Sequence, residues 1–312
     1  MSHPDDILAL NARAYRLQRR VTLVTVLTPM AGLIVAVTHL WGEAVGAIEL
    51  GLLAGMYSLT VVGIDVGLHR LVAHRAFQTT ATLRACLCIF GSMAAQGPVL
   101  FWVAVHRRHH ALSDRPGDPH SPHLEGHGVR GVLRGFWHAH TGWLFTHELP
   151  RAARYVPDLI RNRSVRRISR LYFVWVALGL AIPAGLGGWL HGSLQGALMG
   201  FIWGGLVRMF LVQHVTWSIN SICHLYGSRP FRNADYSANN AWLALLSFGE
   251  SWHNNHHAFP SAAFHGFRWW EVDIAGYVIR ALGWAGLAWD IKRPADLRHK
   301  STAGAGVGVQ AD

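Results

Sequence analysis

Long apolar stretches without a lysine or arginine constrain the fold of this chain more than any other feature. Val21–Leu68 and Leu171–Val207 contain neither residue. A helix of about 20 residues crosses the hydrocarbon core of a bilayer. Glycines interrupt both stretches, at Gly42 and Gly46 in the first and at Gly187, Gly188 and Gly192 in the second. We therefore predict transmembrane helices at about 21–40, 47–68, 171–186 and 194–217.

The charge pattern predicts how these helices are oriented. The net charge is +11, but the cations lie just outside the apolar segments, whereas the connectors His39–Ala47 and Gly187–Gln195 carry no Lys or Arg. The positive-inside rule then places both termini and both long polar segments in the cytoplasm. We expect a multi-pass protein of a bacterial cytoplasmic membrane and no nucleic acid partner.

The sequence divides into three predicted regions. Residues 1–20 are predicted to be a basic amphipathic lead-in, 21–299 the membrane domain, and 300–312 a disordered tail. Ala85–Val105 is interrupted by Gly97 and Pro98, so we interpret it as a re-entrant or interfacial helix. Val272–Trp289 fits either a helix on the membrane surface or a helix of the polar part of the protein. The odd cysteine count argues against a disulfide framework.

Histidine makes up 21 of the 312 residues and gathers beside the inner ends of the apolar helices. His69 and His74 follow the second predicted helix, and Asn220 and His224 lie four residues apart after the fourth. Two segments share the spacing HxxHH. They are His106, His109 and His110, and later His253, His256 and His257. Spacings of three and four should bring the three imidazoles of a segment onto one helical face near a common centre.

These nine histidines exceed the four ligands of a single zinc site. They predict two metals of higher coordination number, and imidazole is compatible with zinc, copper, iron or nickel. A rim site backed by an apolar bundle suits iron and dioxygen, because removing hydrogen from an unactivated methylene requires a strong metal-based oxidant. The sequence contains no GxSxG and no P-loop motif, which argues against a hydrolase or a nucleotide-binding enzyme.

At four segments the chain resembles the integral-membrane fatty acid desaturases, specifically the acyl-CoA (stearoyl-type) branch, from about Gly67 to Phe264. The segments are His69-Arg-Leu-Val-Ala-His74-Arg75, His106–His110 with Asp118-Pro119-His120, Asn220-Ser-Ile-Cys-His224-Leu-Tyr-Gly-Ser-Arg-Pro230, and Gly249-Glu-Ser-Trp-His253-Asn-Asn-His256-His257-Ala-Phe-Pro260.

The resemblance implies an all-α integral membrane protein with four transmembrane helices under a cytoplasmic helical cap. It also implies an oxidoreductase that makes a double bond in a long-chain fatty acyl substrate, at the delta-9 position, with dioxygen and two single-electron deliveries. A separate donor, such as a ferredoxin or a small cytochrome with its reductase, would supply the electrons.

The resemblance also assigns roles to residues. Two irons would be bound by His69, His74, His106, His109, His110, His224, His253, His256 and His257, with Asn220 acting through water. Gln96, Trp102, Thr216 and Trp217 would line the acyl tunnel. Charged residues that grip CoA in animal members are replaced here by Gly97, Ala104 and Val105. The acyl carrier therefore stays open between CoA, acyl carrier protein and a phospholipid, with CoA favoured.

Carboxylates are expected to hold the outer nitrogens of metal-bound imidazoles. The candidates are Asp65, Asp114, Asp118, Glu148, Asp235 and Glu250. Asp65 stands out because it lies one helical turn before His69 in apolar surroundings. Arg208, inside the fourth predicted helix, should face the bundle, form an ion pair or extend its charge inward.

Three other functions are compatible with parts of this pattern. A hydroxylase, ketolase or acetylenase could use the same di-iron site. A metal transporter would place its ligands along a path through the middle of the membrane. A haem cytochrome would need paired axial ligands rather than two HxxHH segments.

Overall fold

The computed structural model describes residues 6–39 and 45–294. The predicted tail at 300–312, the first five residues of the lead-in, and the predicted break at Gly42 lie outside this part of the chain.

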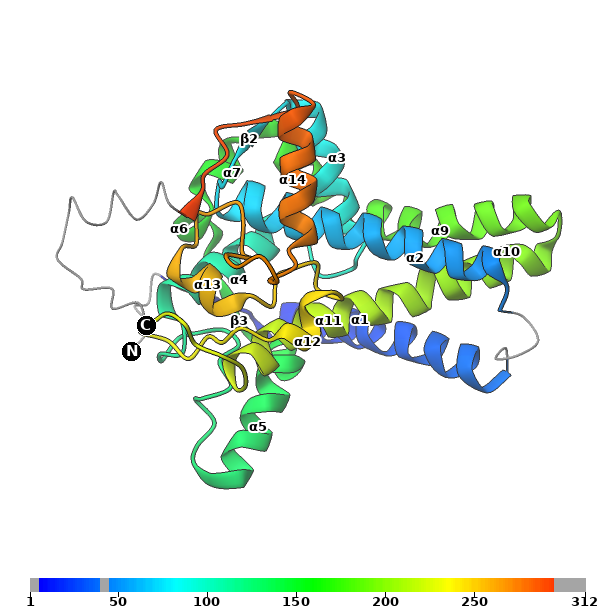
Figure 1. Cartoon of the computed structure of the whole chain (residues 1–312). Helices are drawn as coiled ribbons and strands as arrows, with labels where there is room; N and C mark the ends of the chain where they lie inside the picture. Colours follow the sequence, from blue (N-terminus) through cyan, green and yellow to red (C-terminus); the bar gives the residue numbers. More distant parts are fainter. Residues whose placement is uncertain (1–5, 40–44, 295–312) are drawn as a thin grey trace.

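Among the described residues, four helices are long and apolar enough to cross a membrane. The first is α1 (Ala12–His39), and the second joins α2 (Ala47–Val62) to the π-helical η1 (Gly63–Ala73). The third is α9 (Tyr172–His191), and the fourth joins α10 (Leu194–Gly200), the π-helical η3 (Phe201–Val207) and α11 (Arg208–Ser221). Figure 1 shows them extending to one side of the molecule. The predicted fold class is confirmed, and each helix overlaps its predicted span.

The lead-in is not a separate helix in this structure. Its described residues form the short strand β1 (Ile7–Ala9) and then the first turns of α1. Strand β1 pairs antiparallel with β3 (Glu148–Pro150), with Leu8 opposite Leu149. Residues 7–9 are thereby fixed to a segment that precedes α9.

The remaining elements form a cap at one end of the bundle (Figure 1). Its helices are α3 (Ala81–Ser92), α4 (Val99–Leu112), α5 (Gly128–His140), η2 (Gly142–Phe145), α6 (Ala152–Tyr155), α7 (Pro157–Arg161), α8 (Arg163–Arg170), η4 (Ile222–His224), α12 (Ala241–Ala244), α13 (His253–Ala258) and α14 (Ile274–Trp284). A second strand pair, β2 (Gln78–Thr79) with β4 (Ala288–Trp289), joins early and late parts of the cap. One core packs buried apolar side chains of η1, α3, α4, α8 and α14 together.

The predicted single helix at Ala85–Val105 is corrected to two helices. The chain leaves α3 after Ser92 and re-enters a helix at Val99, and Ala95 (φ 57°) and Gly97 (φ 103°) take left-handed backbone conformations in between. A left-handed residue breaks the helical hydrogen-bond pattern. The turn therefore redirects α4, which carries three of the nine histidines.

A close contact between Gly63 and Gly91 sets the position of η1 against α3. A Cβ atom at Gly63 would lie 2.1 Å from the backbone nitrogen of Gly91, far inside van der Waals contact. Backbones approach this closely only where both residues lack a side chain. This contact helps to place the C-terminal end of η1, where the first histidines lie.

Arg208 is fully buried and points into the bundle, which was one of the alternatives predicted from the sequence. Its guanidinium donates hydrogen bonds to the carbonyl oxygens of Gly204, Met93 and Gly179, at 3.2, 2.8 and 2.6 Å. These acceptors are neutral, so the ion-pair alternative is not supported. The side chain connects α9, α11 and the turn after α3.

Candidate metal centre

Four segments bring the nine predicted histidines to the junction of bundle and cap. His69 lies on η1, and His74 follows its end. His106, His109 and His110 lie on α4, His224 on η4, and His253, His256 and His257 on α13. Eight of these residues are ordered on helical segments and all are buried or half-buried, which fixes the directions of their imidazoles.

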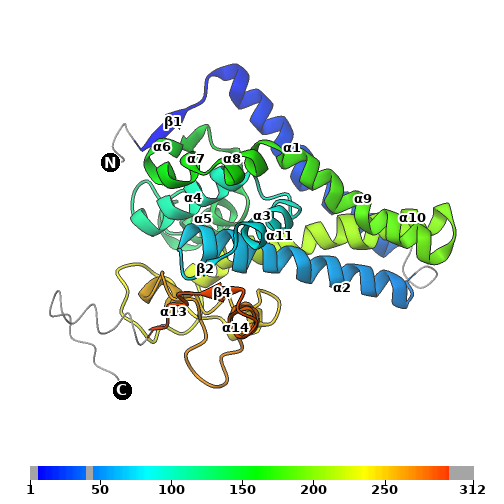
Figure 2. The same cartoon turned by 90° about the horizontal axis from the view of Figure 1, so that it is seen from above.

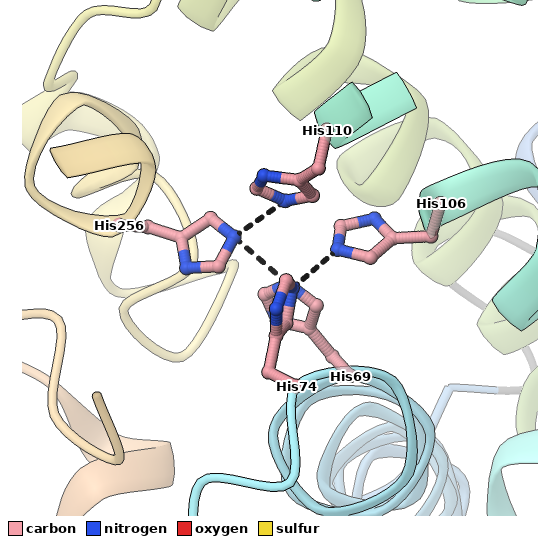
Figure 3. Close-up of side chains that lie close together, drawn as sticks. All are labelled: His69, His74, His106, His110 and His256. Atoms are coloured by element: carbon pink, nitrogen blue, oxygen red, sulfur yellow. Dashed lines mark hydrogen bonds between the residues drawn. The ribbon is translucent and has the colours of Figure 1, made fainter. Parts of the chain in front are cut away.

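Five of the histidines form one group, shown in Figure 3: His69, His74, His106, His110 and His256. Each offers one ring nitrogen, and these nitrogens lie within 4.8 Å of one another. The Nε2 atoms of His74 and His106 are 2.6 Å apart, and Nε2 of His256 lies 2.9 Å from that of His110 and 3.2 Å from that of His69. We call this set the five-histidine group.

The other four, His109, His224, His253 and His257, form a second set with nitrogens within the same distance, the four-histidine group. The Nε2 atoms of His224 and His253 lie 3.0 Å apart. The two groups adjoin, since the ring centroids of His110 and His257 are separated by 4.5 Å.

The expectation that each HxxHH segment surrounds one common centre is wrong. In each segment the first and last histidines, four residues apart, enter one group, and the remaining histidine enters the other. His106 and His110 thus lie apart from His109, and His253 and His257 apart from His256. In an α-helix residues four apart differ by about 40° around the axis, whereas a residue three along lies about 60° to the other side. In each segment the histidines four apart therefore point to one group, and the histidine on the other side of the helix points to the adjacent group.

Carboxylates lie against the outer nitrogens of four histidines. Nδ1 of His109 lies 2.9 Å from Asp118, and Nδ1 of His69 lies 2.6 Å from Glu250. Two other candidates do the same: Asp114 with His224 and Asp235 with His257, both at 2.8 Å. An Nδ1–H that donates to a carboxylate leaves Nε2 with its lone pair free for a metal.

The predicted contact between Asp65 and the outer nitrogen of a histidine is not present in this structure. It is buried, but its Oδ2 has no hydrogen-bond partner, and none of the described histidines contacts it. The reason is local geometry: η1 is π-helical, so residues four apart no longer lie above one another as in an α-helix. Glu250, from the segment before α13, occupies the position beside His69 instead.

Two buried histidines near the groups were not predicted. His265 lies 3.5 Å from Glu250 and packs on His256, and its Nδ1 is 3.2 Å from Arg70. His120 packs on His109 and lies 4.0 Å from Asp118. His120 was within a quoted motif, so its position could have suggested it. His265 stands alone in the sequence and had no spacing signal.

Burial keeps most of these imidazoles neutral. Desolvation, together with neighbouring imidazoles, lowers the pKa of His74, His106, His110, His253, His256 and His257 well below the usual histidine value. The carboxyl group of Asp118 stays charged although it is buried. Burial alone would raise the pKa of Asp118, but His109 and hydrogen bonds outweigh it and hold that pKa at about 2.

The histidines fit metal ions by their donor set and by their unpaired atoms. Nε2 of His109 and Nε2 of His257 are buried and have no hydrogen-bond partner, while the Nδ1 atoms of both rings face carboxylates. A buried polar atom without a partner is costly. Neutral imidazole nitrogens directed at one point are the ligands that a transition metal uses.

A cavity of about 540 Å³ reaches the five-histidine group. Its wall includes all four predicted tunnel residues, Gln96, Trp102, Thr216 and Trp217, together with Asn220 and His106. Most of the other lining side chains come from α1, α4, η2 and the beginning of α9, and many are apolar. An apolar cavity that ends at a cluster of polar side chains is a typical ligand site.

The fold and this site define a helical membrane protein with a double histidine centre beside an apolar cavity. A family model described as fatty acid desaturase matches residues 45–289. The chain therefore belongs to the fatty acid desaturase family, which confirms the resemblance seen in the sequence, and it is an oxidoreductase.

Individual relatives differ in the substrate that their names give. The chain is 50% identical over 280 residues to a hex-5-enoyl-[acyl-carrier protein] acetylenase of Moorena producens, covering 89% of this chain and 87% of the relative. It is 41% identical over 237 residues to an sn-1 stearoyl-lipid 9-desaturase of Synechocystis sp., covering 75% and 68%. It is 37% identical over 244 residues to an acyl-CoA C20 Delta5-desaturase of Anemone leveillei, covering 77% and 72%.

Proposed function

We propose that this chain uses dioxygen to introduce a double bond into a long fatty acyl chain at a centre of two iron ions. The observation that carries this proposal is that His106 both belongs to the five-histidine group and lines the apolar cavity. An acyl chain bound there lies directly beside the metal ligands. Bound iron with dioxygen supplies an oxidant able to take hydrogen from an unactivated methylene.

The two histidine groups are the proposed iron ligands. The five-histidine group would hold one ion, and the four-histidine group the other, with Asn220 as a further ligand through water. Four histidines need an additional donor to reach the coordination number that five provide in the neighbouring group. Asn220 lies on the cavity wall, one helical turn before His224, which supports this role.

The protein's own residues would fix the register of the acyl chain. Trp102 donates from Nε1 to Gln96 at 3.3 Å, and Gln96 donates from Nε2 to Thr216 at 2.9 Å. Polar groups of the wall are thereby satisfied by one another, and the Trp102 ring stacks on His106 with centroids 5.2 Å apart. Burial of each methylene contributes about 0.8 kcal/mol, so wall shape rather than affinity selects the reacting carbons. The delta-9 position stays a prediction.

An acetylenase reaction is the second candidate, favoured by 50% identity over most of the chain to an acetylenase. The same oxidant would then remove one hydrogen from each carbon of an existing double bond, which gives a triple bond. The name of that relative places its acyl chain on an acyl carrier protein, whereas the other relatives named above use a lipid or CoA.

The proposed orientation places the cap in the cytoplasm of a bacterial cell. Arg19, Arg20 and Arg170 lie at the cap-side ends of α1 and α9, whereas the opposite connector 187–195 carries no Lys or Arg. This asymmetry supports a cytoplasmic cap. A separate ferredoxin, or a small cytochrome with its reductase, would then deliver electrons from the cytoplasm.

The test is expression in a bacterial host that lacks a desaturase, followed by mass spectrometry of total acyl chains with localisation of unsaturation. New monounsaturated chains are the expected result, and they would give the position at once. Triple bonds formed only from supplied alkenoic acids would favour the acetylenase. Unchanged or hydroxylated chains from iron-loaded protein with a working reductant would contradict the proposal.

A further inference from the structure

Two helices of the cap-side surface carry stripes of exposed arginines. On α1 the stripe is Arg13, Arg16 and Arg20, and on α8 it is Arg163, Arg167 and Arg170; all six side chains are exposed. Spacings of three, four and seven place each set on one face of its helix. We call the two stripes together the arginine face.

The arginine face is not neutralised within the described part of the chain. The carboxylates nearest in sequence are engaged elsewhere: Asp6 pairs with Arg154, Asp158 with Arg107 and Arg75, and Glu148 lies 3.9 Å from Arg108. No ion pair joins any of the six arginines to a described acidic residue. The face therefore keeps its positive charge for a partner.

The two helices that carry the stripes both border the cavity. Ala14, Leu17 and Gln18 of α1 line it, and so do Ser169 and Arg170 of α8. Figure 2 shows α6, α7 and α8 on the side of the cap where α1 begins. Arg170 is the member of the arginine face that lines the cavity itself, and the other five arginines lie on the same two helices.

We propose that the arginine face docks an acidic acyl carrier protein, whose phosphopantetheine arm carries the acyl chain into the cavity. This proposal rests on the proposed function. Each stripe extends over seven residue steps, about 10 Å along its helix. Two stripes on separate helices match the spread of carboxylates on an acidic protein surface better than the compact phosphate cluster of CoA.

A lipid headgroup explains the face less well. Arg20 and Arg170 adjoin the apolar parts of α1 and α9, where headgroups lie, but Arg13 and Arg163 are about 10 Å further along their helices. Arginine also pairs with carboxylates through two parallel hydrogen bonds. Such charge complementarity mainly accelerates association and weakens at high salt.

Binding is measured first, because it does not depend on turnover. The full chain, in nanodiscs of uncharged phosphatidylcholine, is titrated with fluorescently labelled palmitoyl-[acyl carrier protein], and anisotropy is followed at low and high salt. The test variant is Arg163→Glu with Arg167→Glu. The matched control is Arg130→Glu with Arg134→Glu on α5, which is equally exposed, has the same spacing and does not line the cavity.

Reversing both charges on α8 should weaken binding about ten-fold or more and flatten its salt dependence, whereas the α5 control stays within about two-fold. Equal losses in both variants, or no saturable binding to wild type, would overturn the proposal. It would also fail if the nanodisc-embedded protein bound vesicles containing anionic lipid through these arginines and did not bind the carrier protein. Lipid would then be the partner of the arginines.

Turnover separates this proposal from the proposed function. With palmitoyl-[acyl carrier protein] the α8 variant should show a raised KM and a similar kcat, and with palmitoyl-CoA it should match wild type. Efficient turnover of palmitoyl-CoA without carrier-protein binding would reject the docking surface and keep the desaturase. Arginine-dependent binding without any unsaturated product would reject the desaturase and keep the docking surface.

Discussion

Replacing Asp118 by Asn tests whether the carboxylates beside the histidines hold metal ligands. The Asp118 side chain is fully buried and accepts three hydrogen bonds: from His109 Nδ1, from the backbone N–H of Asp114 at 2.8 Å and from that of His120 at 3.1 Å. Asparagine has the same shape but one oxygen, so its NH2 group must face one of these donors.

The size of the effect of Asp118→Asn can be estimated from these hydrogen bonds. A buried donor left without an acceptor costs about 1–3 kcal/mol, and His109 also loses the negative charge that orients it. Loss of such an outer partner lowers metal affinity about 10- to 100-fold, which corresponds to about 1.4–2.7 kcal/mol. The first cost falls on folding stability, and the second on metal affinity. The loss should fall on the four-histidine group, to which His109 belongs.

The assay is metal content after graded chelator treatment of the purified, iron-loaded chain. Asp118→Asn should release one metal equivalent at about 10- to 100-fold lower chelator concentration and retain the other. Asp158→Asn is the control, because Asp158 is held by Arg107 and Arg75 in the cap and contacts no described histidine. Wild-type retention of both metals by Asp118→Asn, or equal loss in the control, would refute the reasoning.

Three further predictions follow from particular contacts. His256→Ala should abolish turnover and lower iron content while membrane insertion persists, whereas the exposed His127→Ala stays active; full activity of the His256 variant in a product assay would contradict the site. Gly63→Ala should lower thermal stability by about 1–3 kcal/mol through overpacking against Gly91, whereas Gly55→Ala, with nothing near its added Cβ, should not; equal melting temperatures would contradict this. Burial and His214 lower the pKa of His140 to about 4 from 6.5. The unfolded chain therefore gains a proton first as pH falls from 6.5 towards 4, stability declines over this window, and His140→Gln should flatten the decline in a melting series across pH.

Hydropathy and histidine spacing predicted much of this molecule because both are local properties. An apolar run without cations is enough to locate a candidate span, and an HxxHH segment is enough to mark candidate ligands. The sequence could not show which histidine enters which group. That division depends on how α4 and α13 face each other across the centre, which arises from packing between segments far apart in the chain.

The carboxylates show the same limit more sharply. Asp118 follows the second histidine segment at close range, and Glu250 precedes the third, so both could be proposed from proximity. Glu250 nevertheless contacts His69, from a distant segment, rather than a histidine of its own segment. Asp65 seemed well placed by α-helical spacing, and the π-helical geometry of η1 removed that alignment. Local pattern gave the residue types, and tertiary packing gave the partners.

The crossed assignment of the two HxxHH segments has a consequence for assembly. Helix α4 contributes histidines to both groups, and so does α13. If each group holds an ion, as proposed, neither ion can bind without fixing both helices. Binding free energy at such a site is also folding free energy. The first ion to arrive should therefore order much of the second ion's binding site, so that the second ion meets helices that are already held in place.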